Sequence, residues 1–227
     1  VNIKGDSMNE QMLKFLYHYT SIDVLALILS NKTFRFRRLD LMDDPYEAKT
    51  GDFGYQGKYV MCSCWTSKEK EEILTWSLYT NNLRGVRIRL PIFPFEKKYT
   101  ISQEDIPIPI EGGQSYKSYV EAKHIYNDRY FIPGIDFHSS VVEVQYTNDE
   151  TKLYPNVLQS STEGGFAVLL SELGKYKKEI WSPQKEWRYL FPIFPLTRET
   201  IRAFQNGDYK QYAGLIVESM KYEQDPG

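Results

Sequence analysis

The chain has 227 residues, of which 41% are hydrophobic and 15% aromatic, which is enough to build the core of a folded protein. Its formal net charge of -2 excludes a surface that is basic overall and binds nucleic acid for that reason. The basic residues 35–38 could still bind a polyanion locally. No apolar run is long enough to cross a bilayer, so we expect a cytoplasmic protein without membrane contact.

Residues 1–7 precede Met8, and we expect them to be an upstream extension of a single domain at residues 8–227. The chain's two cysteines, Cys62 and Cys64, are two positions apart. Side chains at that spacing in an extended segment point the same way but seldom form a disulfide. Because the histidines are scattered, no zinc-ligand spacing occurs. We therefore expect no metal, and we interpret the thiols as buried apolar groups in a reduced compartment.

In chain order, the first predicted elements are a strand at residues 16–19, a helix that begins at Thr20 or Ser21, and a strand at residues 33–38. The helix has apolar residues at spacings of three and four. The second strand alternates phenylalanine with arginine, which gives it one packed and one cationic face. An Asp-Asp-Pro sequence at residues 43–45 then predicts a turn.

The middle of the chain is predicted to contain a strand at residues 58–65, a helix at residues 68–81 and a strand that begins at Gly85. Residues 91–113 are rich in proline and lack a period, which indicates a long surface connection. The tyrosine-rich residues 115–131 are predicted to be helical.

The last predicted elements are a strand at residues 141–146, a helix at 166–178, a strand around Glu186, a helix at 197–205 and a strand at 214–220. Strands occur in groups separated by helices, without a regular β-α-β alternation. This order favours an α+β fold with mixed, largely antiparallel sheets and flanking helices.

The strand around Glu186 carries polar residues at alternate positions, because Gln184, Glu186 and Arg188 are two apart. A period of two sends these side chains to one face of a strand and Trp187 and Tyr189 to the other. A carboxylate that faces a ribose can hold its hydroxyl group and stabilise positive charge at the anomeric carbon. The amide could orient the incoming nucleophile. The structural alternative is a surface ion pair.

His18 lies at the end of the first strand, just before the predicted helix N-terminus. Helix N-termini attract anions, and a histidine beside one can donate a hydrogen bond to a sugar hydroxyl without carrying a charge. A nucleotide would fit this position. The alternative, which this residue alone favours, is a histidine with a satisfied structural hydrogen bond.

Five sequence blocks are spread over most of the chain: Leu16-Tyr17-His18-Tyr19-Thr20-Ser21, Asp44-Pro45-Tyr46-Glu47, Cys62-Ser63-Cys64-Trp65, Trp76-Ser77-Leu78-Tyr79 with Gly85, and residues 181–188. In order and spacing they resemble the blocks of the bacterial domain-of-unknown-function family numbered 2971, which has no settled activity. Leu78 departs from that pattern, because the family has a histidine at this place.

A more distant resemblance rests on fewer residues: His18 on the first strand, a serine, threonine or tyrosine on a middle strand, and Gln184-x-Glu186 late in the chain. In this order they are similar to the motifs of the ADP-ribosyltransferase superfamily, which includes toxins that modify DNA or protein. The resemblance implies a split-sheet core, His18 on the nicotinamide-side ribose, Glu186 as the catalytic carboxylate and Gln184 near the acceptor.

The middle motif stays open among Ser63, Thr66 and Tyr79, because residues 62–67 are not a plain Ser-Thr-Ser. Trp76 shares a helix face with Tyr79 and could stack on a nicotinamide or adenine ring, or pack in the core. Arginines 35 and 37 could bind a pyrophosphate, or form a solvated strand face. The residues expected to bind the cofactor are His18, Thr20, Arg35, Ser63, Trp76, Tyr79 and Arg188.

These motifs predict a transferase that uses NAD as its substrate and passes ADP-ribose to a protein or nucleic-acid acceptor, as a toxin or defence effector. A second hypothesis is a module that binds a nucleotide or a nucleic-acid end without turnover. A third is a partner-binding protein of a defence or mobile-element system whose interface is the tyrosine-rich part of the predicted helix, Tyr116 to Tyr130.

Overall fold

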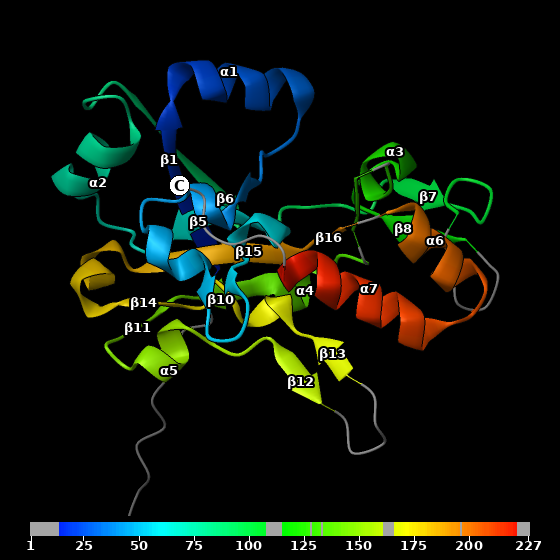
Figure 1. Ribbon diagram of the computed structural model, residues 1–227. Helices are drawn as coiled ribbons and strands as arrows, with labels where there is room; N and C mark the ends of the chain where they lie inside the picture. The colour runs from blue at the N-terminus through cyan, green and yellow to red at the C-terminus, as the bar shows by residue number, and fades with distance from the viewer. Residues whose placement is uncertain are drawn as a thin grey trace, which may run out of the picture.

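The computed structural model describes residues 14–107, 115–127, 129–132, 134–160, 166–195 and 197–221. Its largest sheet has six strands in the order β10-β15-β5-β1-β6, with β2 paired to β5 (Figure 1). The paired strands of this sheet run antiparallel. The strands are β1 (Phe15–Ser21), β2 (Arg37–Arg38), β5 (Val60–Thr66), β6 (Gly85–Pro91), β10 (Val141–Glu143) and β15 (Glu186–Pro192).

Shorter strands in the described residues form two-stranded sheets, of which β11–β14 is parallel and the others are antiparallel. They are β3 (Lys49–Thr50) with β4 (Gly54–Tyr55), β7 (Tyr99–Ile101) with β8 (Tyr116–Ser118), β9 (Tyr130–Phe131) with β16 (Phe194–Pro195), β11 (Gln145–Thr147) with β14 (Tyr176–Lys178), and β12 (Leu158–Ser160) with β13 (Phe166–Val168).

The helices surround the central sheet: α1 packs beside β1 and β6, α2 beside β1, and α7 beside β13 and β16 (Figure 1). The α-helices are α1 (Ile22–Asn31), α2 (Ile73–Tyr79), α3 (Ala122–Ile125), α4 (Phe137–Ser140), α5 (Glu150–Leu153), α6 (Arg198–Gln205) and α7 (Tyr209–Lys221). The short 3-10 helices are η1 (Leu39–Leu41), η2 (Pro45–Ala48), η3 (Gly57–Tyr59), η5 (Leu170–Glu172) and η6 (Glu179–Gln184).

The predicted α+β class is confirmed, because helices occur with mainly antiparallel sheets and without a regular β-α-β alternation. The predicted start of α1 is also confirmed. The Ser21 hydroxyl accepts a hydrogen bond of 3.2 Å from the backbone N–H of Val24. Across the described ranges, no helix has both the length and the apolar character needed to span a membrane.

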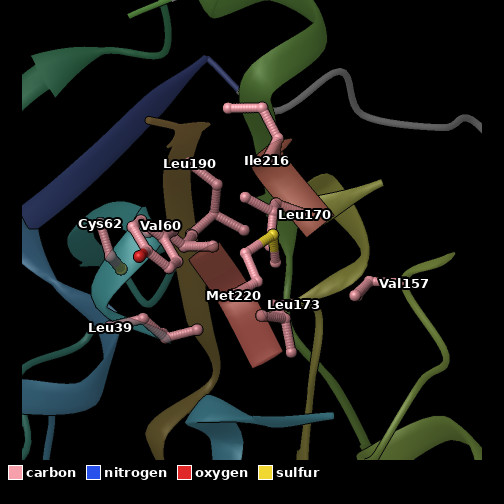
Figure 2. Packing of buried hydrophobic residues seen from close by; sticks show 10 residues of the cluster. Leu39, Val60, Cys62, Val157, Leu170, Leu173, Leu190, Ile216 and Met220 are labelled. Carbon is pink, nitrogen blue, oxygen red and sulfur yellow. The ribbon is translucent and has the colours of Figure 1, made fainter. Parts of the chain in front are cut away.

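Two hydrophobic clusters lie on opposite faces of the central sheet, because side chains alternate along β15. Leu190 packs into the first cluster, where Ile216 and Met220 of α7 lie close to Leu170 (Figure 2). Tyr189, the next residue toward the N-terminus, packs into the second cluster, which is rich in aromatic rings. Glu186 and Arg188 therefore share their face of the sheet with Leu190.

The prediction of one helix at residues 115–131 is wrong, because this segment contains β8, α3 and β9. Its tyrosines pack in two directions, which a single helix face would not allow. Tyr116 and Tyr126 contact a small cluster around Ile101, whereas Tyr119 and Tyr130 contact the aromatic cluster. Because these tyrosines do not lie on one helix, the interface that was expected on a tyrosine-rich helix cannot form in the predicted way.

The prediction of a helix at residues 166–178 is also wrong, because the chain forms β13, η5 and β14 there. Gly174 has a φ of +79°, which a right-handed helix does not adopt. It also packs tightly, since a Cβ at this position would lie 3.3 Å from side-chain atoms of Leu39 and Leu190. Close packing on the core thus overrides the helical pattern of the sequence.

The strand predicted at residues 214–220 is helical and belongs to α7. Ile216 and Met220, four positions apart, are both buried in the first cluster. A helix places residues at this spacing on one face, whereas the run of β-branched residues suggested a strand.

Other predicted elements exist with different bounds. The strand at residues 33–38 pairs only at β2, and the helix at 68–81 is shortened to α2. The proline-rich connection contains β7. The strand at 141–146 is divided at Val144, whose N–H donates a hydrogen bond of 2.9 Å to the backbone carbonyl of Glu186.

Candidate functional site

Strands β1 and β5 pair at one position, where Tyr17 faces Thr66, and their ladder then stops. If the antiparallel register continued, Tyr19 would face Cys64. The His18 side chain takes the place of that backbone contact, because its Nδ1 lies 2.8 Å from the Cys64 carbonyl oxygen. Further along β5, Cys62 pairs with Arg37 of β2. Among the residues that the structure describes, this edge of β5 thus has no paired strand between these two points.

Two adjacent cavities lie at this break in the sheet. The main cavity has a volume of about 360 Å³ and is lined by residues 18–20 of β1 and 62–64 of β5, among others. The side cavity, of about 110 Å³, has a largely apolar lining that includes Tyr17, Trp65, Leu74 and Leu78. Residues that line both cavities are His18, Tyr19, Cys64, Tyr79 and Glu186.

Most of the residues predicted for the site meet at these cavities. Those that line one or both are His18, Thr20, Arg35, Ser63, Thr66, Tyr79, Gln184, Glu186 and Arg188. Trp76 lines neither. Its ring packs edge-on against Tyr19 with centroids 5.2 Å apart, and its indole N–H donates a hydrogen bond of 3.0 Å to Glu71. The structure therefore places Trp76 behind the wall of the site.

Glu186 belongs to a buried cluster of two carboxylates and two cations. Arg188 donates hydrogen bonds of 2.7 and 3.0 Å to the two oxygens of Glu186, and of 2.5 and 3.1 Å to those of Glu47. Lys177 of β14 donates a bond of 3.1 Å to Glu186 and lies 3.6 Å from Glu47. These four charges cancel. Such pairing is what allows charged groups to remain buried.

The cluster keeps Glu186 ionised. Burial by itself would raise the pKa of Glu186, but Arg188 and Lys177 outweigh it and lower the pKa to about 2. Burial raises the pKa of Glu47, because the same two cations offset only part of the desolvation there. Glu186 is therefore the carboxylate of the cluster that stays charged over the wider pH range.

Gln184, Glu186 and Arg188 were predicted to share one face of a strand. This prediction holds for Glu186 and Arg188 but not for Gln184. Gln184 precedes the strand and ends η6, and Lys185 after it is left-handed at a φ of 46°. The Gln184 amide nevertheless joins the cluster, because its oxygen accepts a hydrogen bond of 2.9 Å from Lys177. Its NH₂ group donates a bond of 2.6 Å to the Tyr79 hydroxyl.

Tyr79 connects this network to the other side of the main cavity. Its hydroxyl donates a hydrogen bond of 2.9 Å to the Asp43 carboxylate. Burial, followed by the charge of Asp43, raises the pKa of Tyr79 well above its usual range. Tyr79 therefore stays protonated and fixes the position of Gln184.

His18 forms a structural hydrogen bond with the Cys64 carbonyl, as one of the two interpretations of the sequence expected. It also lines both cavities. Burial lowers the pKa of His18, and the bond to Cys64 offsets only part of this effect. The ring is thus neutral at pH 7. Because a carbonyl oxygen only accepts, Nδ1 carries the proton and Nε2 is left as an acceptor. The expected donor role toward a hydroxyl becomes an acceptor role.

Arg35 and Arg37 add positive charge to the main cavity. Both side chains are exposed and line it, while the alternate residues Phe34 and Phe36 pack on the aromatic cluster. Within the described part of the chain, neither arginine forms an ion pair. Two guanidinium groups are therefore available to an anionic ligand.

Sequence reasoning missed Lys177 and Glu47. Lys177 lies in a segment that was expected to be helical, among other lysines, so no pattern marks it. Glu47 did have a signal, since it ends the Asp-Pro-Tyr-Glu block, and Asp44 caps η2 by accepting a hydrogen bond of 3.0 Å from the Tyr46 N–H. That cap positions Glu47 toward Arg188.

Comparison of the chain with protein-family models, curated proteins and solved structures found no match.

Proposed function

We propose that the two cavities bind NAD and that the protein cleaves its nicotinamide–ribose bond and transfers ADP-ribose to a protein or nucleic-acid acceptor. The observation that carries this proposal is the convergence of His18 and Glu186, from opposite ends of the chain, on the same two cavities. An imidazole and a carboxylate placed in this way can contact one ribose.

The linings of the two cavities suit the two parts of a dinucleotide. Aromatic and apolar side chains in the side cavity, among them Tyr17, Trp65 and Leu78, favour a flat ring such as nicotinamide. In the main cavity, Arg35 and Arg37 offer paired N–H donors to a pyrophosphate. His18 and Glu186 line both, and this supports a ribose between ring and phosphates.

The electrostatics of Glu186 indicate which role it has. A pKa of about 2 makes it a weak general base near neutral pH, since an efficient base has a pKa near the working pH. An ionised carboxylate is instead suited to stabilise positive charge on an oxocarbenium-like ribose. Because the buried cluster has no net charge, Glu186 acts only on a group in direct contact with it.

The Glu186 carboxylate retains one hydrogen-bond acceptor site for contact with the ribose. A carboxylate has about four acceptor sites, and Arg188 and Lys177 fill three of them. The thiol of Cys64 also lowers the pKa of Glu186 through a hydrogen bond. A thiol is a weak donor, so a ribose hydroxyl can replace it at the remaining site.

The strand arrangement gives further support. The resemblance to ADP-ribosyltransferases implies a histidine, a hydroxyl residue and a glutamate on three core strands. Here β1, β5 and β15 are neighbours and carry His18, Ser63 or Thr66, and Glu186 in that order. Thr66 already donates a hydrogen bond of 3.0 Å to the Lys185 carbonyl. It thereby holds the turn that precedes Glu186.

Binding without turnover is the second candidate function. One observation favours it: both oxygens of Glu186 are already bound by Arg188 and Lys177, as expected for a structural ion cluster. In this case Arg35 and Arg37 would hold a nucleotide or nucleic-acid end, and no bond would be cleaved.

The test is nicotinamide release from NAD, together with incorporation of labelled ADP-ribose into protein or nucleic acid. We expect Glu186→Gln to lower the rate by roughly 10²-fold or more, the typical loss when one transition-state contact is removed. The matched control is Glu143→Gln, which alters an exposed glutamate on the neighbouring strand β10.

Thermal unfolding of each variant separates a chemical effect from loss of the fold, because Glu186 is buried in the cluster. A folded Glu186→Gln variant with wild-type turnover would remove Glu186 from the mechanism. A wild type that binds NAD but neither releases nicotinamide nor transfers ADP-ribose would establish the second candidate instead.

A further inference from the structure

Three sulfur atoms lie together in the wall of the main cavity. Cys62 and Cys64 of β5 are two positions apart and present their side chains on one face, with their Sγ atoms 3.4 Å apart. The Sδ of Met42, which follows η1, lies 3.8 Å from the Sγ of Cys64. Both cysteines are free thiols, and all three residues line the cavity.

We propose that these three side chains form a binding site for a soft monovalent metal ion, Cu(I). Thiolate and thioether sulfurs are the ligands that Cu(I) prefers among protein side chains. A metal–sulfur bond is about 2.3 Å long, so one ion can contact two sulfurs that are up to about 4.6 Å apart. The two sulfur–sulfur separations, 3.4 and 3.8 Å, fall within this limit.

The ligand set favours Cu(I) over zinc. Structural zinc takes four ligands, most often Cys and His. Within the described residues, no group of three or more His, Cys, Asp or Glu side chains is placed to hold a metal ion. His18, on the facing strand, directs Nδ1 to the Cys64 carbonyl rather than to the sulfurs. The cluster therefore offers two thiols and one thioether, which suffice for a Cu(I) site but not for zinc.

Binding of Cu(I) changes the charge at the sulfurs. The ion replaces the two thiol protons, so the complex of one Cu(I) with two thiolates carries one negative charge and two protons are released. The hydrogen bond with Cys62 and burial raise the pKa of Cys64, and Arg188 offsets only part of this effect. Since each ion must displace protons, its affinity rises as pH rises.

The site is tested by anaerobic titration of the full chain with Cu(I) held by the chromogenic chelator bathocuproine disulfonate. We expect the wild type to take one ion per chain from the chelator. Cys64→Ser removes a thiolate and should abolish the transfer. Met42→Leu removes the thioether but keeps an apolar side chain of similar size, and should weaken binding by roughly tenfold or more, since even outer-shell changes cost 10- to 100-fold.

Met61→Leu is the matched control, because Met61 belongs to β5 but packs on the opposite face, in the aromatic cluster. It should bind Cu(I) as the wild type does. Thermal unfolding confirms that each variant is folded, and copper X-ray absorption should show sulfur neighbours alone. A reduced wild type that leaves Cu(I) with the chelator, or a folded Cys64→Ser variant that binds it equally well, would overturn the site. Neither result depends on NAD turnover.

Discussion

Glu186 meets two requirements that usually separate structural from functional carboxylates. It is paired inside a buried ion cluster with Arg188 and Lys177, and it also lines both cavities. A strongly shifted pKa in a cavity marks a candidate functional residue, although structural ion clusters shift pKa values as well. The pH dependence of stability measures the first role directly.

The pKa of Glu186 is lowered from 4.5 to about 2 in the folded protein. A lowered pKa means that the ionised group stabilises the folded state above pH 4.5 and that this contribution is lost as the pH falls toward 2. We expect the advantage of wild type over Glu186→Gln in free energy of unfolding to be constant near neutral pH. It should shrink by about 2 kcal/mol by pH 3.

Urea denaturation of both proteins at a series of pH values gives this difference. The comparison between the two proteins cancels the titration of carboxylates outside the cluster. A difference that stays unchanged from pH 7 to pH 3 would mean that Glu186 does not have the lowered pKa on which its proposed role depends.

Single-residue features of the site were predictable where local geometry alone decides them. A period of two is enough to place Glu186 and Arg188 on one face of β15. It fails for Gln184, because the left-handed Lys185 turns the chain before the strand begins. The partner Lys177 comes from another strand, β14, and its contact depends on tertiary structure that no local pattern contains.

Among the elements, those predicted well have a strong local signal. Strands β1, β5, β6 and β15 and helix α1 were located because alternation or a cap defines them. The segments at residues 166–178 and 214–220 were assigned to the wrong class. In both, contacts with the first hydrophobic cluster decide the conformation, and the local pattern is ambiguous for short apolar runs.

Gly174 shows how packing determines the conformation of the segment at residues 166–178. Gly174→Ala adds a Cβ at a φ of +79° and at 3.3 Å from Leu39 and Leu190. We expect it to lower the free energy of unfolding by about 1–2 kcal/mol, the cost of a left-handed conformation for a residue with a Cβ. The substitution would also disturb the buried ion cluster, because the Gly174 carbonyl accepts a hydrogen bond of 2.9 Å from Arg188.

Gly134→Ala is the control for this substitution, since a Cβ there would meet no atom of the described residues within 4 Å. Chemical denaturation of the two variants should show a loss of stability for Gly174→Ala alone. Equal stability of both variants would mean that the Gly174 position is free of the packing constraint described.

For the molecule as a whole, the break between β1 and β5 determines where the site lies. Their pairing stops after Tyr17 and Thr66, and the cavities form beside the part of β5 that is left unpaired. The α+β class follows from the order of elements along the chain, but the neighbours of each strand do not. His18 and Glu186 were expected to meet only from a resemblance, and the sheet order β15-β5-β1 is what brings them close.

The central claim is that these cavities bind NAD, and calorimetric titration with NAD tests it most directly. The proteins to compare are the wild type, Arg35→Gln and the control Arg198→Gln. Arg35 lines the main cavity, whereas Arg198 is exposed on α6. We expect one NAD per chain for wild type and control, and roughly tenfold weaker binding for Arg35→Gln, the value of one charge-assisted hydrogen bond. The absence of binding by the wild type, or equal affinity in all three proteins, would contradict the account.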